Sequence, residues 1–241
     1  AGCRSLWRLA PPWRSRCGCR RRRRPAATGW SWTSCRSTSA GSPSVAGHHA
    51  HIRLPSWPRP KPEDPPCTEQ TSLDPNSPYA ASKASADLLA LASARTYNQP
   101  VLITRCTNNY GPFQFPEKLI PLVIHNALTG KQLPIYGDGS NIRDWLYVDD
   151  HCRGIHLAGE RGISGKKYLF GGENQMCNLE LAKWIIELMG QSIDLIEFVE
   201  DRKGHDLRYS MDSAKLKNEL GWEPKTNIQD GLRKTLEWFN A

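Results

Sequence analysis

The sequence from residue 61 onward predicts an α/β fold. Short apolar runs of strand length alternate there with longer segments of helical periodicity. Pro, Gly, Asn and Asp gather at the boundaries between these segments, as they do in turns. No apolar run is long enough to cross a membrane. We therefore expect a sheet with helices packed on it.

The first predicted element is a helix over residues 80–97, rich in Ala and Leu. Ser77 is a suitable N-cap, Pro78 suits the first turn, and Pro100 lies beyond the end. An apolar run at 101–106 predicts a strand, and Asn-Asn-Tyr-Gly-Pro at 108–112 predicts a polar turn. The order of helix, strand and loop is that of an α/β sheet.

The remaining elements follow from the same rules of periodicity and capping. Residues 113–130 are expected to form a loop and then a helix. Asp149 is the expected cap of a helix that ends near Arg161, and Asn178 is the expected cap of a helix over 179–189. The other predicted segments are strands at 134–136, 145–148, 167–170 and 193–199, a tight turn at 137–141, and helices at 212–220 and 228–239.

Tyr79 and Lys83 are four residues apart on the first predicted helix. Their side chains therefore share one face, with the Cβ atoms about 5–6 Å apart. A cation beside a phenol stabilises the phenolate, which makes Tyr79 a usable base near neutral pH. The same spacing also arises by chance on helical surfaces, so the pair alone does not define a site.

Residues 1–60 differ in composition from the rest of the chain. They hold twelve Arg, five of the nine Trp and four of the eight Cys, but no Lys, Asp or Glu. Residues 61–241 carry 20 basic and 24 acidic residues, so the formal net charge of +8 comes from the first segment. No run in that segment has helical or strand periodicity, and we do not expect it to build a core.

Three explanations compete for this Arg-, Ser-, Trp- and Pro-rich segment. A secretory or transit signal is disfavoured, because no apolar run of about 7–15 residues follows the basic stretch. The Arg run at 20–24 is able to bind nucleic-acid phosphates without sequence specificity. We favour the third, a coding sequence translated in the wrong frame, because a shifted GC-rich frame turns Val and Leu codons into Ser, Arg, Trp, Cys and Pro codons. Residues 1–60 are then non-native or disordered.

Neither histidines nor cysteines indicate a metal site. The histidines at 48, 49 and 51 cluster, but no Cys, Asp or Glu stands beside them at ligand spacing. The four cysteines after residue 60 have no metal or redox spacing. We expect no metal, and reduced thiols in a cytoplasmic protein.

Six blocks carry a resemblance to a known family. They are Ser-Pro-Tyr-Ala-Ala-Ser-Lys-Ala at 77–84, Thr-Arg-Cys-Thr-Asn-Asn-Tyr-Gly-Pro at 104–112, Phe-Pro-Glu-Lys-Leu-Ile-Pro at 115–121, Leu-Pro-Ile-Tyr-Gly at 133–137, Ile-Arg-Asp-Trp-Leu-Tyr-Val-Asp-Asp-His at 142–151 and Asp-Arg-Lys-Gly-His-Asp at 201–206. Together they resemble the extended short-chain dehydrogenase/reductase family, and within it the nucleotide-sugar 4,6-dehydratases. The resemblance runs from residue 62 to the C-terminus, with departures at Lys203, where Pro is usual, and at Leu207, where a second Arg is usual.

The resemblance implies a division of the chain into two domains. Residues 61–113 and 144–175 would be the remainder of a Rossmann-type domain, a doubly wound parallel sheet that binds NAD. Residues 114–143 and 176–241 would form a smaller α/β domain that binds the nucleotide sugar. Family members usually pair as homodimers through the helix that bears the Tyr.

The resemblance also implies roles for single residues. Tyr79 would be the catalytic base that takes the proton of the sugar C4 hydroxyl. Lys83 would hold the nicotinamide ribose, and Asn109 would face the cofactor. The residues implied in nucleotide-sugar binding are Asn108, Lys118, Leu119, Pro134, Ile135, Tyr136, Arg143, Asn178, Asp201, Arg202, Lys203, Gly204 and His205. For Arg143 and Asn178, an ordinary salt bridge and a helix cap are the plainer alternatives.

The implied reaction is NAD-dependent dehydration of a nucleotide-diphospho-hexose, with dTDP-glucose as the expected substrate, to the 4-keto-6-deoxy sugar. The family's Gly-x-x-Gly-x-x-Gly turn and its Thr-Asp-Glu acid/base motif do not occur in this sequence. We therefore expect an inactive, truncated form, in which the strand at 101–106 lacks neighbours. The alternatives are an epimerase or decarboxylase of the same family, or a non-catalytic remnant that binds nucleotide sugar or nucleic acid.

Overall fold

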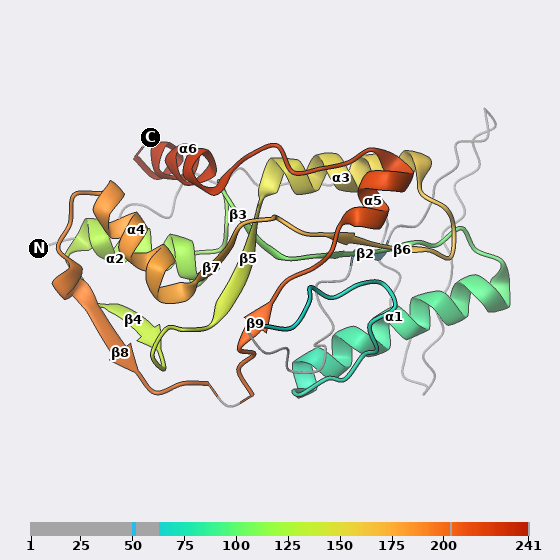
Figure 1. Cartoon of the computed structure of the whole chain (residues 1–241), viewed down its shortest axis with the longest axis horizontal. Helices are drawn as coiled ribbons and strands as arrows, with labels where there is room; N and C mark the ends of the chain where they lie inside the picture. The colour runs from blue at the N-terminus through green and yellow to red at the C-terminus, as the bar shows by residue number, and fades with distance from the viewer. Residues whose placement is uncertain (1–49, 52–62, 203, 241) are drawn as a thin grey trace, which may run out of the picture. The chain divides into compact units, whose positions relative to one another are not determined.

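The computed structural model describes residues 50–51, 63–202 and 204–240 (Figure 1). All of them belong to the second of two units of the chain, which begins at Val45. Most of the Arg-rich segment, including the Arg run at 20–24 and the histidines at 48 and 49, lies outside the described residues, and so does Lys203.

A parallel sheet of three strands forms one end of the described fold. It runs in the order β1 (Ala50–His51), β2 (Ile103–Cys106) and β6 (Lys167–Phe170). All four residues of β2 are buried, as expected for a central parallel strand. The expectation that this strand lacks neighbours is wrong, because it pairs with β1 on one side and with β6 on the other.

Helices cover both faces of this sheet. Figure 1 shows α1 (Pro78–Tyr97) on one side of β2 and β6, with α3 (Val148–Arg161) and α5 (Ala214–Leu220) on the other. The core under α3 and α5 combines aliphatic side chains with the aromatic rings of Tyr168, Phe170 and Trp222. The ring of Phe170 packs edge-on against that of Trp222, with centroids 5.0 Å apart. The alternation of strands and helices predicted from the sequence is confirmed here.

Two of the three predicted helix caps are wrong. Ser77 caps α1 as predicted, and its hydroxyl accepts a hydrogen bond from the amide of Ala80 at 3.2 Å. Asp149 instead lies within the first turn of α3. A carboxylate there interacts favourably with the positive end of the helix dipole. Asn178 is the first residue of α4 (Asn178–Leu188), and Cys177 is the cap, with its sulfur accepting a hydrogen bond from the amide of Glu180.

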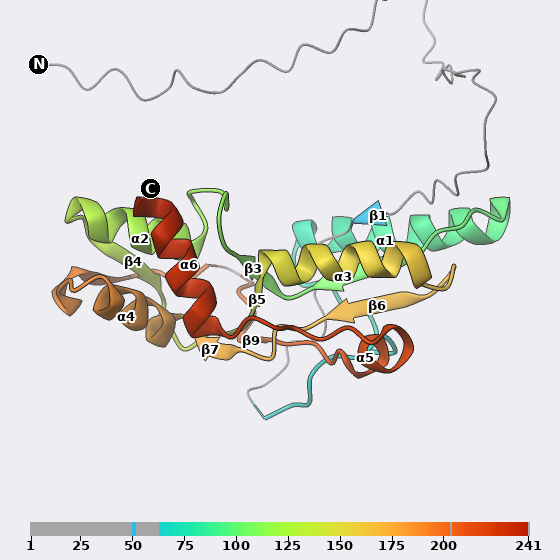
Figure 2. The same cartoon turned by 90° about the horizontal axis from the view of Figure 1, so that it is seen from above.

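The other end of the fold combines a four-stranded and a two-stranded sheet with three helices (Figure 2). Strand β5 (Ile142–Tyr147) pairs with β3 (Asn108–Tyr110), β7 (Gln175–Cys177) and β9 (Arg208–Tyr209). Strand β4 (Leu133–Tyr136) pairs with β8 (Ile196–Val199) in parallel. The helices are α2 (Leu119–Thr129), α4 (Asn178–Leu188) and α6 (Ile228–Asn240).

Several strand predictions need correction. Residues 108–110, predicted as a turn, form β3, because they pair in parallel with the buried strand β5. Strand β5 begins three residues before the predicted strand at 145–148. The predicted strand at 193–199 opens with a 3₁₀ turn over Ile193–Leu195, and only the rest is β8. Strands β7 and β9 were not predicted.

The buried carboxylate of Asp144 ties β5 to the loop that follows β6. It accepts hydrogen bonds from the amides of Gly172 at 2.7 Å and Asn174 at 2.8 Å. Burial raises the pKa of Asp144, and these two donors act in the opposite direction. The contact fixes the backbone of β5, which carries several of the predicted site residues.

A second buried carboxylate, Asp150, leads to a stability prediction. It accepts from the amides of Lys225 at 2.9 Å and Thr226 at 2.7 Å, and it pairs with Arg153 at 2.7 Å. Burial acts to raise the pKa of Asp150, but the hydrogen bonds from Thr226, Arg153 and Lys225 together hold it below its usual value. A depressed carboxyl pKa stabilises the fold above the unfolded-state pKa of about 3.9, and this stabilisation is lost as the pH falls through the folded-state value.

We expect Asp150→Asn to lower the free energy of unfolding at pH 7 by about 1–3 kcal/mol, because the two amides keep a poorer acceptor. The variant should also lose less stability than the parent protein between about pH 5 and pH 3. Urea unfolding at a series of pH values measures both effects. Asp149→Asn, an exposed carboxylate in the same turn, is the control and should cost less than about 1 kcal/mol. Equal losses of stability at both positions would show that the hydrogen bonds to Asp150 do not stabilise the fold.

Candidate functional site

A cavity of about 610 Å³ lies between the β4 and β5 region and the start of α2. It is lined by nine of the thirteen residues that the sequence analysis assigned to nucleotide-sugar binding: Asn108, Lys118, Leu119, Pro134, Tyr136, Arg143, Asn178, Arg202 and His205. These residues come from β3, α2, β4, β5, α4 and the loop after β8. The fold therefore gathers positions that are widely separated in the sequence.

Four of the assigned residues do not line this cavity. Ile135 is buried in the apolar core with Leu133, since neighbouring residues of a strand point to opposite faces. Asp201 and Gly204 belong to the same loop as Arg202 but lie outside the lining. Lys203 is outside the described residues.

Arg143 is held in place by its own neighbourhood. Its Nη1 donates to the carbonyl oxygen of Ile142 at 2.7 Å, and its Nη2 donates to that of Asp206 at 2.8 Å. Burial lowers the pKa of Arg143, and the carboxylate of Asp206 opposes that shift. The guanidinium remains a cation, because Arg is not deprotonated in proteins. It offers a fixed, partly desolvated positive charge to a ligand.

The loop after β8 supplies a second cation and an aromatic face. The guanidinium carbon of Arg202 lies 4.1 Å from the centre of the Tyr136 ring. In the same loop, Nδ1 of His205 lies 2.6 Å from Oδ1 of Asp201. This hydrogen bond holds the pKa of Asp201 below its usual value. Asp201 thereby fixes the orientation of His205 at the wall of the cavity.

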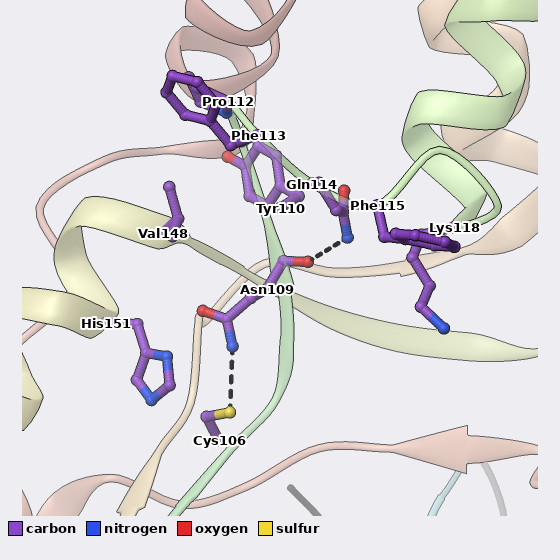
Figure 3. Close-up of a pocket in the computed structure, with 11 residues that line it drawn as sticks. Cys106, Asn109, Tyr110, Pro112, Phe113, Gln114, Phe115, Lys118, Val148 and His151 are labelled. Carbon is purple, nitrogen blue, oxygen red and sulfur yellow. Dashed lines mark hydrogen bonds between the residues drawn. The ribbon is translucent and has the colours of Figure 1, made fainter. Parts of the chain in front are cut away.

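Asn109 faces a second cavity of about 450 Å³ (Figure 3). Its side-chain amide donates to the sulfur of Cys106 at 3.0 Å, and its backbone carbonyl accepts from Nε2 of Gln114 at 2.7 Å. The wall also includes Val148 and His151 from α3. Asn108 and Asn109 thus serve different cavities, as expected for neighbours on a strand. Lys118 lines both cavities.

Tyr79 and Lys83 lie on α1, as the sequence predicts. The ammonium nitrogen of Lys83 is 5.5 Å from the centre of the Tyr79 ring, and the Tyr79 side chain is 61% exposed. Helix α1 runs into the loop before β2, so its first turn lies toward the carboxyl end of that strand (Figure 1). The pair is accessible, although it lines neither of the two cavities.

Sequence reasoning missed Glu117, Leu122 and Trp145, which also line the larger cavity. Leu122 lies four residues after Lys118, at helical spacing, and Trp145 lies two residues after Arg143 on the same strand. Those two spacings place Leu122 and Trp145 on the same faces as Lys118 and Arg143, so the sequence could have indicated both as lining residues. Glu117 pairs with Lys118 at 3.2 Å, and nothing in its spacing distinguishes it from an ordinary surface carboxylate.

The described residues carry no sign of a metal or membrane site. Within them, no three His, Cys, Asp or Glu side chains gather as a metal site would require. No helix in this part of the chain is both long and apolar enough to span a bilayer. Within the same residues, the cysteines at 67, 106, 152 and 177 form no disulfide.

The parallel strands, the Tyr-x-x-x-Lys helix and the cation-lined cavity define an α/β protein of the NAD-dependent epimerase/dehydratase type. The chain belongs to the GDP-mannose 4,6 dehydratase family, whose model matches residues 61–235. The resemblance inferred from the six sequence blocks is thereby confirmed.

Known proteins of this type resemble the chain over about three quarters of its length. It is 48% identical over 183 residues to the dTDP-glucose 4,6-dehydratase of Escherichia coli. This match covers 71% of the present chain and 51% of the Escherichia coli protein. The NAD complex of dTDP-glucose 4,6-dehydratase from Bacillus anthracis superposes with a TM-score of 0.71 at 51% identity, covering 74% of this chain and 57% of that one. The corresponding Streptomyces venezuelae enzyme, with NAD and TYD bound, gives a TM-score of 0.76 at 47% identity, covering 79% and 59%. The chain spans about half the length of the curated relatives it matches.

Proposed function

We propose that the larger cavity binds a nucleotide-diphospho-hexose, with dTDP-glucose as the preferred ligand. The observation that carries this proposal is that nine residues implied in nucleotide-sugar binding by the sequence line one cavity. The similarity to dTDP-glucose 4,6-dehydratases, one of them solved with NAD and TYD, supports this ligand over GDP-mannose. The Asn-Asn-Tyr-Gly-Pro and Pro-Glu-Lys-Leu-Ile-Pro blocks favour a dehydratase over an epimerase or decarboxylase.

The charges of the cavity suit a diphosphate. Lys118, Arg143 and Arg202 contribute three cations, whereas Glu117 is the one carboxylate among the described lining residues. A guanidinium presents paired N–H groups to phosphate oxygens, which an ammonium does not. The Tyr136 ring offers a flat face on which a base is able to stack.

The reaction that we infer for this type of site is dehydration to the 4-keto-6-deoxy sugar. Bound NAD would supply the hydride acceptor for oxidation at C4 and the hydride donor for reduction at C6, with water lost across C5 and C6 between the two transfers. Tyr79 takes the proton of the C4 hydroxyl, Lys83 holds the nicotinamide ribose and keeps a positive charge beside the phenol, and Asn109 faces the cofactor. The closeness of Lys83 to the accessible Tyr79 ring fits these roles.

The two-domain division also remains a proposal. Residues 61–113 and 144–175 contain β2, β6, α1 and α3, which fit the remainder of a cofactor domain. Residues 114–143 and 176–241 contain β4, β8, α2 and α4, which fit a sugar-binding domain. Because the Gly-x-x-Gly-x-x-Gly turn and the Thr-Asp-Glu motif do not occur in the sequence, we infer that this chain by itself binds nucleotide sugar but does not complete the reaction.

We further infer a cytoplasmic homodimer. The four described cysteines form no disulfide with one another, which fits a reducing compartment. Leu88, Leu89 and Tyr97 of α1 have exposed fractions of 60%, 71% and 70%, an apolar surface that fits pairing with a second copy.

Calorimetry with the purified 241-residue chain tests the proposal. We expect dTDP-glucose to bind more tightly than GDP-mannose, and no 4-keto product to form with NAD, as followed by the alkaline absorbance of that product. Absence of dTDP-glucose binding would overturn the assignment of the cavity, and robust turnover would overturn the inference of inactivity. Salt-sensitive retention on nucleic acid without sugar binding would favour the nucleic-acid alternative.

A further inference from the structure

Helix α1 is attached to the described fold by an unusually small set of buried side chains. Of its twenty residues, those buried are Ala80, Ala84 and Asp87. None of the three apolar clusters formed by the described residues includes a residue of α1. Two methyl groups and one carboxylate therefore account for the fully buried contact of the helix that carries Tyr79 and Lys83.

Among the described residues, the buried carboxylate of Asp87 pairs with Arg105. Nε of Arg105 donates to Oδ2 of Asp87 at 2.7 Å, and Nη2 of Arg105 lies 2.5 Å from the same oxygen. Both side chains are 1% exposed. Arg105 belongs to β2, which is paired on both sides, so its backbone is fixed by the sheet. The pair joins the middle of α1 to a rigid strand.

The position of this pair relates it to the proposed catalytic residues. Tyr79, Lys83 and Asp87 lie at intervals of four residues on α1. Because four residues make slightly more than one helical turn, each is rotated a little further round the helix, from the exposed Tyr79 to the buried Asp87. Asp87 lies about 12 Å along the helix from Tyr79. On the other side, Arg105 stands three residues before Asn108. A rotation of α1 about its axis would move the phenol relative to the end of β2 and to β3.

We propose that Asp87 and Arg105 are positioning residues, which set the rotation of α1 on β2 and thereby fix where Tyr79 and Lys83 stand relative to the carboxyl end of β2. The inference rests on the proposed function for the roles of Tyr79 and Lys83. A charged hydrogen-bonded pair is directional, whereas contacts between alanine methyl groups and a sheet are not. Small side chains let a helix approach closely but leave its rotation weakly fixed.

The test separates stability from position. Asp87→Asn removes the carboxylate that faces a buried guanidinium and should reduce the folding equilibrium constant by more than about a hundredfold. The double variant Asp87→Leu/Arg105→Met removes both charges and should recover most of that loss. If the pair fixes rotation, the double variant remains stable while α1 is displaced. If the pair only contributes stability, the double variant restores the position of α1 as well.

Methyl NMR of the full chain without ligand reads the position of α1. Signals of Ala80 and Ala84, assigned by substitution with Ser, should shift or split in the double variant, whereas those of Ile185 in the distant core should not. Lys217→Met/Glu223→Leu removes an exposed ion pair of 2.6 Å and is the matched control. Unchanged Ala80 and Ala84 signals in a stable double variant would overturn the proposal.

A second readout uses the proposed ligand. In chain labelled with 3-fluorotyrosine, the Tyr79 signal, assigned with Tyr79→Phe, should respond to dTDP-glucose but not to dTDP, which lacks the hexose. The double variant should bind dTDP-glucose within about threefold of the parent affinity and lose most of the Tyr79 response. A full response in that variant would contradict the positioning role. If the parent chain binds neither compound, the proposed function fails, and the methyl signals still decide whether the pair sets the rotation of α1.

Discussion

Replacing Gly172 by alanine lowers the free energy of unfolding by more than about 4 kcal/mol. A Cβ atom on Gly172 would lie 2.0 Å from the carbonyl oxygen of Trp145 and 2.4 Å from its carbonyl carbon. That carbonyl belongs to β5, which is paired along both edges, with β3, β7 and β9 as its partners. Neither backbone is able to move away without breaking hydrogen bonds, including the one from the Gly172 amide to Asp144.

Urea unfolding of the purified variant measures the effect, and the yield of soluble protein provides a second measure. Gly190→Ala is the matched control. Its added Cβ meets nothing within 4 Å, but the backbone has a φ of +63°. It should therefore cost only about 1–2 kcal/mol of left-handed strain. A Gly172 variant no less stable than the Gly190 variant would show that the contact with β5 relaxes.

Replacing Arg143 by methionine weakens dTDP-glucose binding by at least about thirtyfold. Loss of a partly buried cation that pairs with a charged group costs about 2–5 kcal/mol, and methionine keeps much of the length of the stem. Arg143→Lys should also bind weakly, because a single ammonium does not reproduce the paired N–H groups. The unfolding free energy should change less, since the described contacts of Arg143 are with two carbonyl oxygens.

Calorimetric titration of the Arg143 variants with dTDP-glucose provides the measurement. Arg233→Met removes an exposed cation of α6 that pairs with Asp230 at 3.7 Å and does not line the cavity. It should leave the affinity unchanged. A loss of less than about threefold in Arg143→Met would show that the guanidinium does not contact the diphosphate.

Features set by nearby residues were predictable from the sequence. Ser77 caps α1 and Tyr79 lies beside Lys83, because both relations depend only on helical spacing. Successive side chains of a strand point to opposite faces, so this rule separates Ile135 from Pro134 and Tyr136. Period two would have excluded Ile135, which points into the core between two residues that line the cavity.

Features set by distant partners were not predictable. Asn108 and Asn109 have the composition of a turn, and the pairing of β3 with β5 overrides that preference. The partner of Arg105 is eighteen residues away, so an Arg in an apolar strand could signal a buried carboxylate without identifying Asp87. The meeting of Arg202 with Tyr136 depends on the pairing of β8 with β4.

The span of chain that encloses the larger cavity has a consequence for folding. Its walls run from Asn108 to His205, so they meet only after the chain has closed several long loops. On a ribosome the cavity is complete only when the strands at 133–147 and the loop after β8 have all emerged. A nucleotide sugar that contacts both ends of this span would therefore bind only chains that have finished folding. At one hundred times its dissociation constant, it would protect them against unfolding by about 2.7 kcal/mol.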